Sequence, residues 1–248
     1  IRREQMFTLP SKRMRFLETI PAIFICWKSL ILTLLPLSFL GALFTSIPSL
    51  GLNFKLIQPF HSGFYIASVV SLILYLIPSG AIITRINNAV HGKSITDAQA
   101  LNIGVLRLPK MLMTLIVSMF IFFLLPVLLM LFHTPGIWVY IIGVAFLCIV
   151  FPYFIPALPL VIIDNKWPFD ALISSVRLVR HNWLVVFGAL AIIYLINLAI
   201  SFSLHALYAY NFLGNTSMLV ATFIVSILTL PLWTAMTVIV TENLKRKK

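Results

Sequence analysis

The stretch Leu184–Leu207, LVVFGALAIIYLINLAISFSLHAL, contains no Asp, Glu, Lys or Arg. A helix crosses the hydrocarbon core of a bilayer with roughly 20 mostly apolar residues, so this stretch is long enough to span a membrane. Five more stretches have no charged residue at their centre: Ser29–Leu50, Gly63–Ile83, Met111–Phe132, Ile137–Ile163 and Ser217–Val240. Strands of a membrane barrel would instead alternate apolar and polar residues. We therefore expect an all-α, polytopic membrane protein with six transmembrane helices in one integral domain over residues 1–248.

The composition supports lipid as the solvent of this chain. Hydrophobic residues make up 61% of the 248 positions and charged residues only 10%, against about 45–50% and about 25% in soluble domains. The net charge of +12 comes from basic residues beside apolar spans, which favours anionic lipid headgroups over nucleic acid as their partners. Cys26 and Cys148 both lie in apolar sequence, so buried or lipid-facing thiols are favoured over a disulfide or a metal pair.

The positions of the basic residues predict the orientation. All Lys and Arg except Lys55 lie before the first span, after the last, or in the connections after the second and fourth spans. Under the positive-inside rule, both termini are expected in the cytoplasm. Residues 1–16 show no cleavage-site pattern of small residues, so we expect no cleaved signal peptide.

Three polar segments precede the odd-numbered spans: Phe16–Lys28, Ser94–Lys110 and Pro168–Trp183. Each places apolar residues at helical spacing, which is typical of a helix lying in the headgroup plane. In the second segment, Ser94 and Asp97 have the spacing of a capping box.

These segments also align with one another. An offset of 73 residues places Asp97 on Asp170 and Arg107 on Arg180, and prolines recur in the even-numbered spans. The pattern predicts a threefold repeat of an interfacial helix and a pair of spans, with units near residues 16–90, 91–165 and 166–244.

Three motifs in the second half of the chain carry a family resemblance: PALPLVIID at 156–164, FDAL at 169–172 and SVRLVRHNW at 175–183. They resemble the YciC family of uncharacterised bacterial inner-membrane proteins. They are also similar to the membrane domain found ahead of some bacterial glycerophosphodiester phosphodiesterases. The resemblance covers most of the chain and implies six helices and a bacterial inner-membrane location. It implies no activity, because those phosphodiesterases carry their chemistry in a separate soluble barrel.

The sequence shows no catalytic constellation. Membrane enzymes need a nucleophile with a base, a metal cluster or paired carboxylates, whereas the six acidic residues are spread over several segments and no His-x-x-x-His pair occurs. Asp164 and Asp170 are close in sequence, but a helix-terminal charge and a helix-capping acid explain them more simply. We expect no enzyme activity, no metal and no cofactor.

Basic residues next to the spans are the first candidate site. We expect them to form a collar at headgroup level, and the candidate lipid-headgroup contacts are Lys28, Arg107, Lys110, Arg177 and Arg180. The leading hypothesis is a non-catalytic inner-membrane protein that binds anionic lipids, or a protein partner or second copy of itself, in envelope or lipid homeostasis. A collar that only sets the topology is the alternative.

A channel or a transporter for lipid or small solute is the other function class. Asn197 is the most polar residue deep in a span, and Ser201 follows on a related face, so both are candidates for an intramembrane polar site. Hydrogen bonding between helices is the simpler explanation and is favoured over a substrate site. Pro152, Pro156 and Pro159 interrupt one span, and broken helices can mark transport sites. This hypothesis predicts a cavity between the helix pairs.

Overall fold

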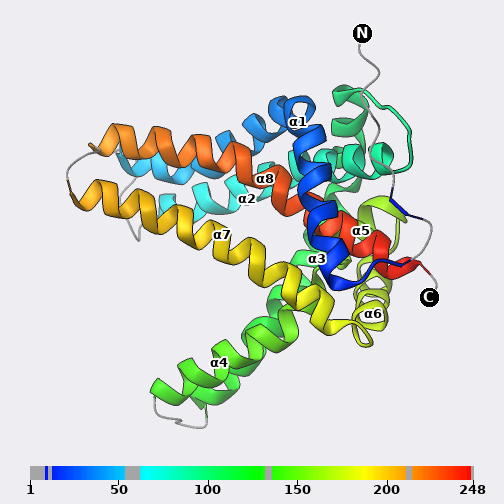
Figure 1. Ribbon diagram of the computed structural model, residues 1–248. Coiled ribbons are helices and arrows are strands. Elements are labelled where there is room, and N and C mark those ends of the chain that lie inside the picture. Colours follow the sequence, from blue (N-terminus) through cyan, green and yellow to red (C-terminus); the bar gives the residue numbers. More distant parts are fainter. Residues whose placement is uncertain (1–8, 11–12, 54–61, 132–135, 211–213, 247–248) are drawn as a thin grey trace.

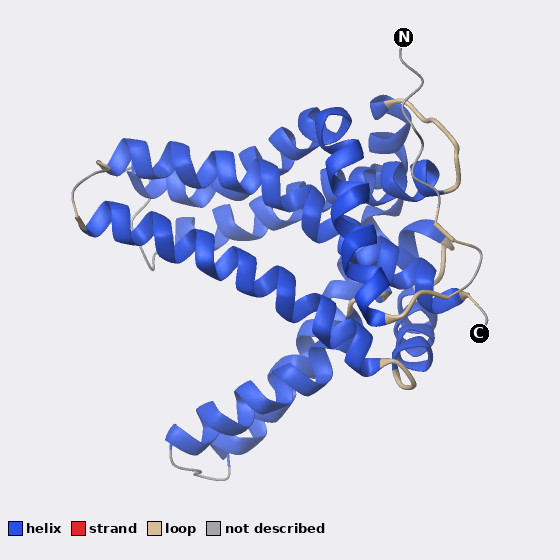
Figure 2. Ribbon diagram, viewed as in Figure 1, coloured by secondary structure: helices blue, strands red, loops and turns tan. Residues whose placement is uncertain are grey.

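The computed structural model describes residues 9–10, 13–53, 62–131, 136–210 and 214–246, which are helical apart from short connections (Figure 2). The helices in chain order are α1 (Phe16–Asn53), α2 (Ser62–Val90), α3 (Asp97–Leu131), α4 (Gly136–Val150), the 3-10 turn η1 (Phe151–Phe154), α5 (Ala157–Ile163), α6 (Pro168–Val179), α7 (Trp183–Ala209) and α8 (Asn215–Lys245). No strand occurs in this described part of the chain, so the all-α prediction is confirmed.

Among the described residues, six helical segments are long and apolar enough to cross a membrane. They are Phe16–Pro48, Ser62–Val90, Asp97–Leu124, Ile141–Ile163, Trp183–Ala209 and Thr216–Lys245. Each overlaps one of the six predicted spans, so the lengths and composition of these helices are those of a multi-pass membrane protein.

Two of the three predicted interfacial segments are not separate helices. Residues 16–28 form the beginning of α1, and most of residues 94–110 form the beginning of α3. Apolar residues continue from each segment into its span, and α3 runs through Pro109 without ending. Only α6 is set apart from its span: the Asn182 amide donates to the Val179 carbonyl at 2.7 Å, and α7 begins at the next residue.

The capping box of α3 lies two residues later than the spacing of Ser94 and Asp97 predicts. The Thr96 amide donates to Gln99 Oε1 at 3.1 Å, and the Gln99 amide donates to Thr96 Oγ1 at 3.3 Å. A hydroxyl residue followed three positions later by Gln satisfies two free helical N–H groups at once, which explains why α3 begins at Asp97.

The fourth span is broken by its prolines. α4 ends at Val150, η1 makes one 3-10 turn, and α5 begins at Ala157. Proline has no N–H to donate and its ring clashes with the preceding turn. Pro152 and Pro156 therefore interrupt a run that hydropathy alone predicts as one helix.

The molecule divides into two regions. We call residues 9–10, 13–28, 76–111, 155–193 and 231–246 the base, and the remaining described residues the distal ends. In Figure 1 the base lies on the right, while the distal ends point away from it: α1, α2, α7 and α8 in one direction, and α3 and α4 in another. Among the described residues, the buried apolar side chains outside the base are Leu34, Leu37 and Ala42 on α1 and Pro152 in η1.

The second half of α8 forms the centre of the base. From Pro231 to Leu244 every residue is buried except the half-buried Trp233. A helix segment that is buried on all sides is surrounded by other helices, and α8 as a whole contacts α1, α2, α5, α6 and α7. Its threonine hydroxyls donate within the helix, as from Thr241 to the Thr237 carbonyl at 2.6 Å, so they cost little to bury.

Asn243 joins α8 to the segment that precedes α1. Its Oδ1 accepts from the Met14 amide at 2.7 Å, and its Nδ2 donates to the Met14 carbonyl at 3.1 Å and to Thr19 Oγ1 at 3.3 Å. Asn243 is 1% exposed. These bonds satisfy buried backbone groups just before α1. They also join the end of α8 to the beginning of the described chain.

Glycine lets α2 and α3 approach closely. A Cβ atom at Gly104 would lie 2.5 Å from the Ile77 carbonyl oxygen, while one at Gly143 in α4 would meet nothing within 4 Å. Small residues allow close helix packing in membranes, where lipid offers no hydrophobic drive for helix association. Gly104 thus allows close helix packing in the base, whereas no neighbouring helix packs closely against Gly143 in α4.

Candidate functional site

All charged side chains in the described part of the chain lie in the base. The distal ends instead expose large apolar side chains, such as Phe120, Phe123 and Phe202. Lys55 falls outside the described residues. Candidate sites therefore fall into two kinds: a charged surface on the base, and cavities deeper among the spans.

A network of four charged or polar side chains crosses the base. Lys245 Nζ lies 2.8 Å from Asp164 Oδ1 and 2.8 Å from Glu242 Oε1, and His91 Nε2 lies 3.7 Å from Glu242 Oε2. The Glu242 side chain is only 10% exposed, so the nearby ammonium compensates its buried charge. The network links the ends of α2, α5 and α8.

Arg107 and Lys110, two of the predicted headgroup contacts, bind protein groups instead of facing free solvent. Arg107 Nη1 donates to the Val161 carbonyl at 3.4 Å, and Lys110 Nζ donates to Asn165 Oδ1 at 2.8 Å. The Lys110 ammonium also lies 5.5 Å from the centre of the Trp167 ring. Both cations thus stabilise the carboxyl end of α5, where helical carbonyls lack amide partners.

Lys28, Arg177 and Arg180 are exposed on the base. Arg180 Nε donates to His181 Nε2 at 3.0 Å. Within the described residues, Lys28 and Arg177 make no hydrogen bond or ion pair with another side chain. The structure does not gather the five predicted contacts into one site: two are engaged with protein, and three lie open on the surface.

A cleft on the base contains other basic residues that the sequence prediction missed. Its volume is about 240 Å³, and it is lined by Leu160, Asp164, Lys166, Ser174, Arg177, Leu178 and Lys245. Lys166 Nζ donates to Ser174 Oγ at 2.9 Å. Lys166 and Lys245 lie in different predicted segments, so spacing along the chain could not bring them together.

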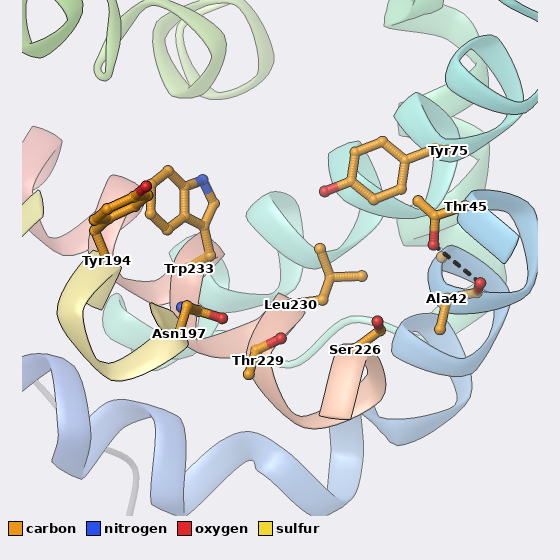
Figure 3. A pocket seen from close by; sticks show the side chains of 10 residues that line it. Ala42, Thr45, Tyr75, Tyr194, Asn197, Ser226, Thr229, Leu230 and Trp233 are labelled. Carbon is orange, nitrogen blue, oxygen red and sulfur yellow. Dashed lines mark hydrogen bonds between the residues drawn. The ribbon is translucent and has the colours of Figure 1, made fainter. Parts of the chain in front are cut away.

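Asn197 lines a cavity among α1, α2, α7 and α8 (Figure 3). The cavity has a volume of about 390 Å³, and its lining residues are Gly41, Ala42, Thr45, Tyr75, Tyr194, Asn197, Ser226, Thr229, Leu230 and Trp233. Asn197 Nδ2 donates to the Ile193 carbonyl of its own helix at 2.9 Å. Ser201, the other predicted polar residue, is exposed and lies outside this lining.

A second cavity of about 380 Å³ lies among α2, α3, η1, α5 and α8. Its walls include Phe122, Phe151, Phe154 and Leu158, with hydroxyls such as Ser118 between them. Ser118 donates to the Thr114 carbonyl of its own helix, so the wall presents mainly apolar surface. The broken span thus contributes to a cavity, although a different one from that of Asn197.

Tyr75 and Trp233 line both cavities. Figure 3 shows the two side chains on opposite sides of the Asn197 cavity, with Leu230 between them. These two aromatic rings therefore lie at the boundary between the two cavities.

The two neighbouring carboxylates do not form a pair. Asp164 binds Lys245, and Asp170 lies exposed in the first turn of α6, where the helix dipole favours a negative charge. In the described part of the chain, no three His, Cys, Asp or Glu side chains come together as metal ligands.

Comparisons with protein families, curated proteins and solved structures find no match to this chain. The resemblance to the YciC family thus stays a prediction.

Proposed function

We propose that this chain is a non-catalytic inner-membrane protein whose base faces the cytoplasm and binds anionic lipid headgroups. The observation that carries the proposal is the separation of charge. The described basic residues all lie in the base, whereas the described distal ends carry no Lys, Arg, Asp or Glu and expose large apolar side chains such as Phe120, Phe123 and Phe202. Basic residues at the cytoplasmic surface attract anionic lipids, at about 1 kcal/mol each.

The surface of α6 supports a position at headgroup level. Phe169 is 60% exposed and Ile173 is 51% exposed, and Arg177 and Arg180 are exposed on the same helix. Exposed apolar and basic residues on one short helix are typical of an interfacial helix. In this arrangement the apolar side chains enter the acyl region while the guanidinium groups contact phosphates.

Two tryptophans support the proposal of a threefold repeat. Trp27 Nε1 donates to the Leu228 carbonyl at 3.0 Å, and Trp183 Nε1 donates to the Ile149 carbonyl at 2.9 Å. Each tryptophan lies at the start of a proposed unit's first span, and each carbonyl lies three residues before a proline of a return span. The two bonds are similar in kind, although Pro231 aligns with Pro156 in the predicted repeat and Ile149 lies one helical turn before the aligned position.

Lipid retention tests the proposal. The chain is reconstituted in nanodiscs of phosphatidylcholine with phosphatidylglycerol, and the lipids that remain bound are measured by native mass spectrometry. Combined Lys28→Gln, Arg177→Gln and Arg180→Gln should reduce retained phosphatidylglycerol, because they remove the open cations. The Asp170→Asn control removes a negative charge from the same surface and should not reduce it. Equal retention by the triple variant and the original chain would refute the proposal.

A lipid or solute conduit is the second candidate, because the two cavities share Tyr75 and Trp233 as a boundary. If lipid passes this boundary, Trp233→Ala should accelerate the exchange of fluorescent phosphatidylglycerol between the leaflets of proteoliposomes. Trp183→Ala, which alters a tryptophan outside both linings, is the matched control. Exchange no faster than in protein-free vesicles would remove this candidate.

A further inference from the structure

We propose that the cleft between α5, α6 and α8 is a binding site for the phosphomonoester headgroup of an anionic lipid, such as phosphatidate. This inference rests on the proposed function, because it assigns one part of the collar a selective role. The cleft is formed by Leu160 and Asp164 at the end of α5, Lys166 before α6, Ser174, Arg177 and Leu178 on α6, and Lys245 on α8.

Two cations in this cleft are available to a ligand. Lys166 binds only the Ser174 hydroxyl among the described residues, and Arg177 is exposed there without an ion-pair partner. Lys245 differs, since Asp164 and Glu242 both hold it at 2.8 Å. A phosphate can therefore bind Lys166 and Arg177 without breaking an existing ion pair.

The chemistry of the cleft fits a doubly charged phosphate. Arg177 can offer two parallel N–H donors to two phosphate oxygens, and Lys166 and the Ser174 hydroxyl can donate to others. A phosphomonoester carries a charge of about −1.5 to −2 at neutral pH. Asp164 and Glu242 compensate Lys245, so Lys166 and Arg177 supply the two positive charges that face such a dianion. A phosphodiester headgroup carries about one negative charge fewer than a phosphomonoester, so it should bind the two cations less strongly.

The surroundings of the cleft favour a lipid over a free phosphate. Trp167 next to Lys166 is 68% exposed, and Phe169 and Ile173 on α6 are also exposed. Aromatic side chains of this kind lie at the membrane–water interface. The cleft thus lies at the depth where a lipid presents its phosphate, with apolar side chains beside it for the acyl chains.

Other basic residues of the base lack this arrangement. Arg107 and Lys110 already bind the Val161 carbonyl and the Asn165 side chain. Lys28 and Arg180 are exposed but do not line the cleft. They make a matched pair for Lys166 and Arg177, because each pair has one Lys and one Arg.

The experiment compares selectivity between two lipids. Nanodiscs contain phosphatidate and phosphatidylglycerol in competition at matched total surface charge, and native mass spectrometry gives the ratio of the retained lipids. The original chain should prefer phosphatidate about fivefold, the effect of roughly one more charge pair at the surface. Lys166→Gln with Arg177→Gln should bring the ratio close to one. Lys28→Gln with Arg180→Gln should lower total retention and leave the ratio unchanged.

The outcomes separate the two proposals. A ratio that falls equally in both double variants would overturn the selective cleft and leave the general collar standing. Absence of anionic lipid retention in the original chain would overturn both proposals. Displacement of phosphatidate by soluble glycerol 3-phosphate at equal concentration would show that free phosphate esters are the ligand, and would overturn the lipid assignment. Thermal unfolding is the folding control and should be unchanged in both double variants. The Arg177→Lys variant keeps the positive charge but loses the paired N–H donors. It should retain part of the preference for phosphatidate.

Discussion

The apolar side chains of the base and those of the distal ends have different surroundings. In the base, Ile239 has no exposed surface, and its neighbours are other helices. In the distal ends, Phe202 is 76% exposed on an equally apolar helix. Hydropathy measures the transfer of a side chain out of water and does not distinguish a protein neighbour from a lipid. The difference shows that the fold of this chain depends on the base, while the distal ends depend on the bilayer.

The largest expected effect comes from removing a large side chain in each region. Ile239→Ala should lower the free energy of unfolding by about 3 kcal/mol, because the buried helix cannot collapse around the cavity that is left. Phe202→Ala should cost less than about 1 kcal/mol, because lipid fills the space. Thermal unfolding in the same nanodiscs measures both. Equal losses in the two variants would contradict the comparison.

A second pair of variants compares two asparagines. Asn243→Ala removes the bonds to Met14 and leaves buried backbone groups unpaired, so we expect a loss of about 2 kcal/mol. Asn197 bonds only to a carbonyl of its own helix, and Asn197→Ala should change the stability by less than about 0.5 kcal/mol. Chemical unfolding in mixed micelles, followed by tryptophan fluorescence, measures the stability of both variants. An Asn243→Ala variant as stable as the original chain would show that the contact between the segment before α1 and α8 does not stabilise the fold.

Substitution of two glycines by alanine should change the stability by smaller amounts, and the two changes should have opposite signs. Gly104→Ala should destabilise the chain by about 1–2 kcal/mol, because the new methyl group collides with the Ile77 backbone oxygen. Gly143→Ala should leave the stability unchanged or raise it by up to about 1 kcal/mol, because its Cβ meets open space and alanine favours the helix. Melting temperatures of the two variants give the sign directly. An increase for Gly104→Ala would mean that α2 and α3 are not held at this distance.

The smallest effect concerns the charged network of the base. Glu242→Gln should cost about 1 kcal/mol, because Lys245 keeps Asp164 as a partner when it loses the buried carboxylate. Asp170→Asn on the exposed surface of α6 is the control and should have no measurable effect on unfolding. If high salt removes the difference between the two variants, the network is solvated and contributes only through screened attraction.

The sequence predicts the features that depend on local composition. Six spans, the break near Pro152 and the separation of α6 from α7 follow from apolar length and from residues that end helices. The burial of α8 from Pro231 onwards could not be predicted in this way, because a lipid-facing span and a protein-facing span have the same hydropathy.

The contacts of the candidate site residues follow less directly from the sequence than the fold does. Its position beside a span predicts Arg107 as a headgroup contact, and in the structure its guanidinium reaches the end of α5. The cleft depends on Lys166, Arg177 and Lys245, and the last of these is far from the others in sequence. Contacts between residues far apart in sequence depend on how the helices pack, and this packing cannot be predicted from a single sequence.

The position of α8 has a consequence for synthesis of the protein. α8 leaves the ribosome after α1 to α7 and yet supplies the centre of the base. The earlier helices therefore enter the bilayer before the central helix of the base exists, and long-range contacts such as Met14 with Asn243 form only afterwards. Until then, the Met14 backbone groups that Asn243 binds have no partner from α8. Completion of this fold thus depends on its last-made helix, and a ribosome that stalls before α8 leaves α1 to α7 without the centre of the base.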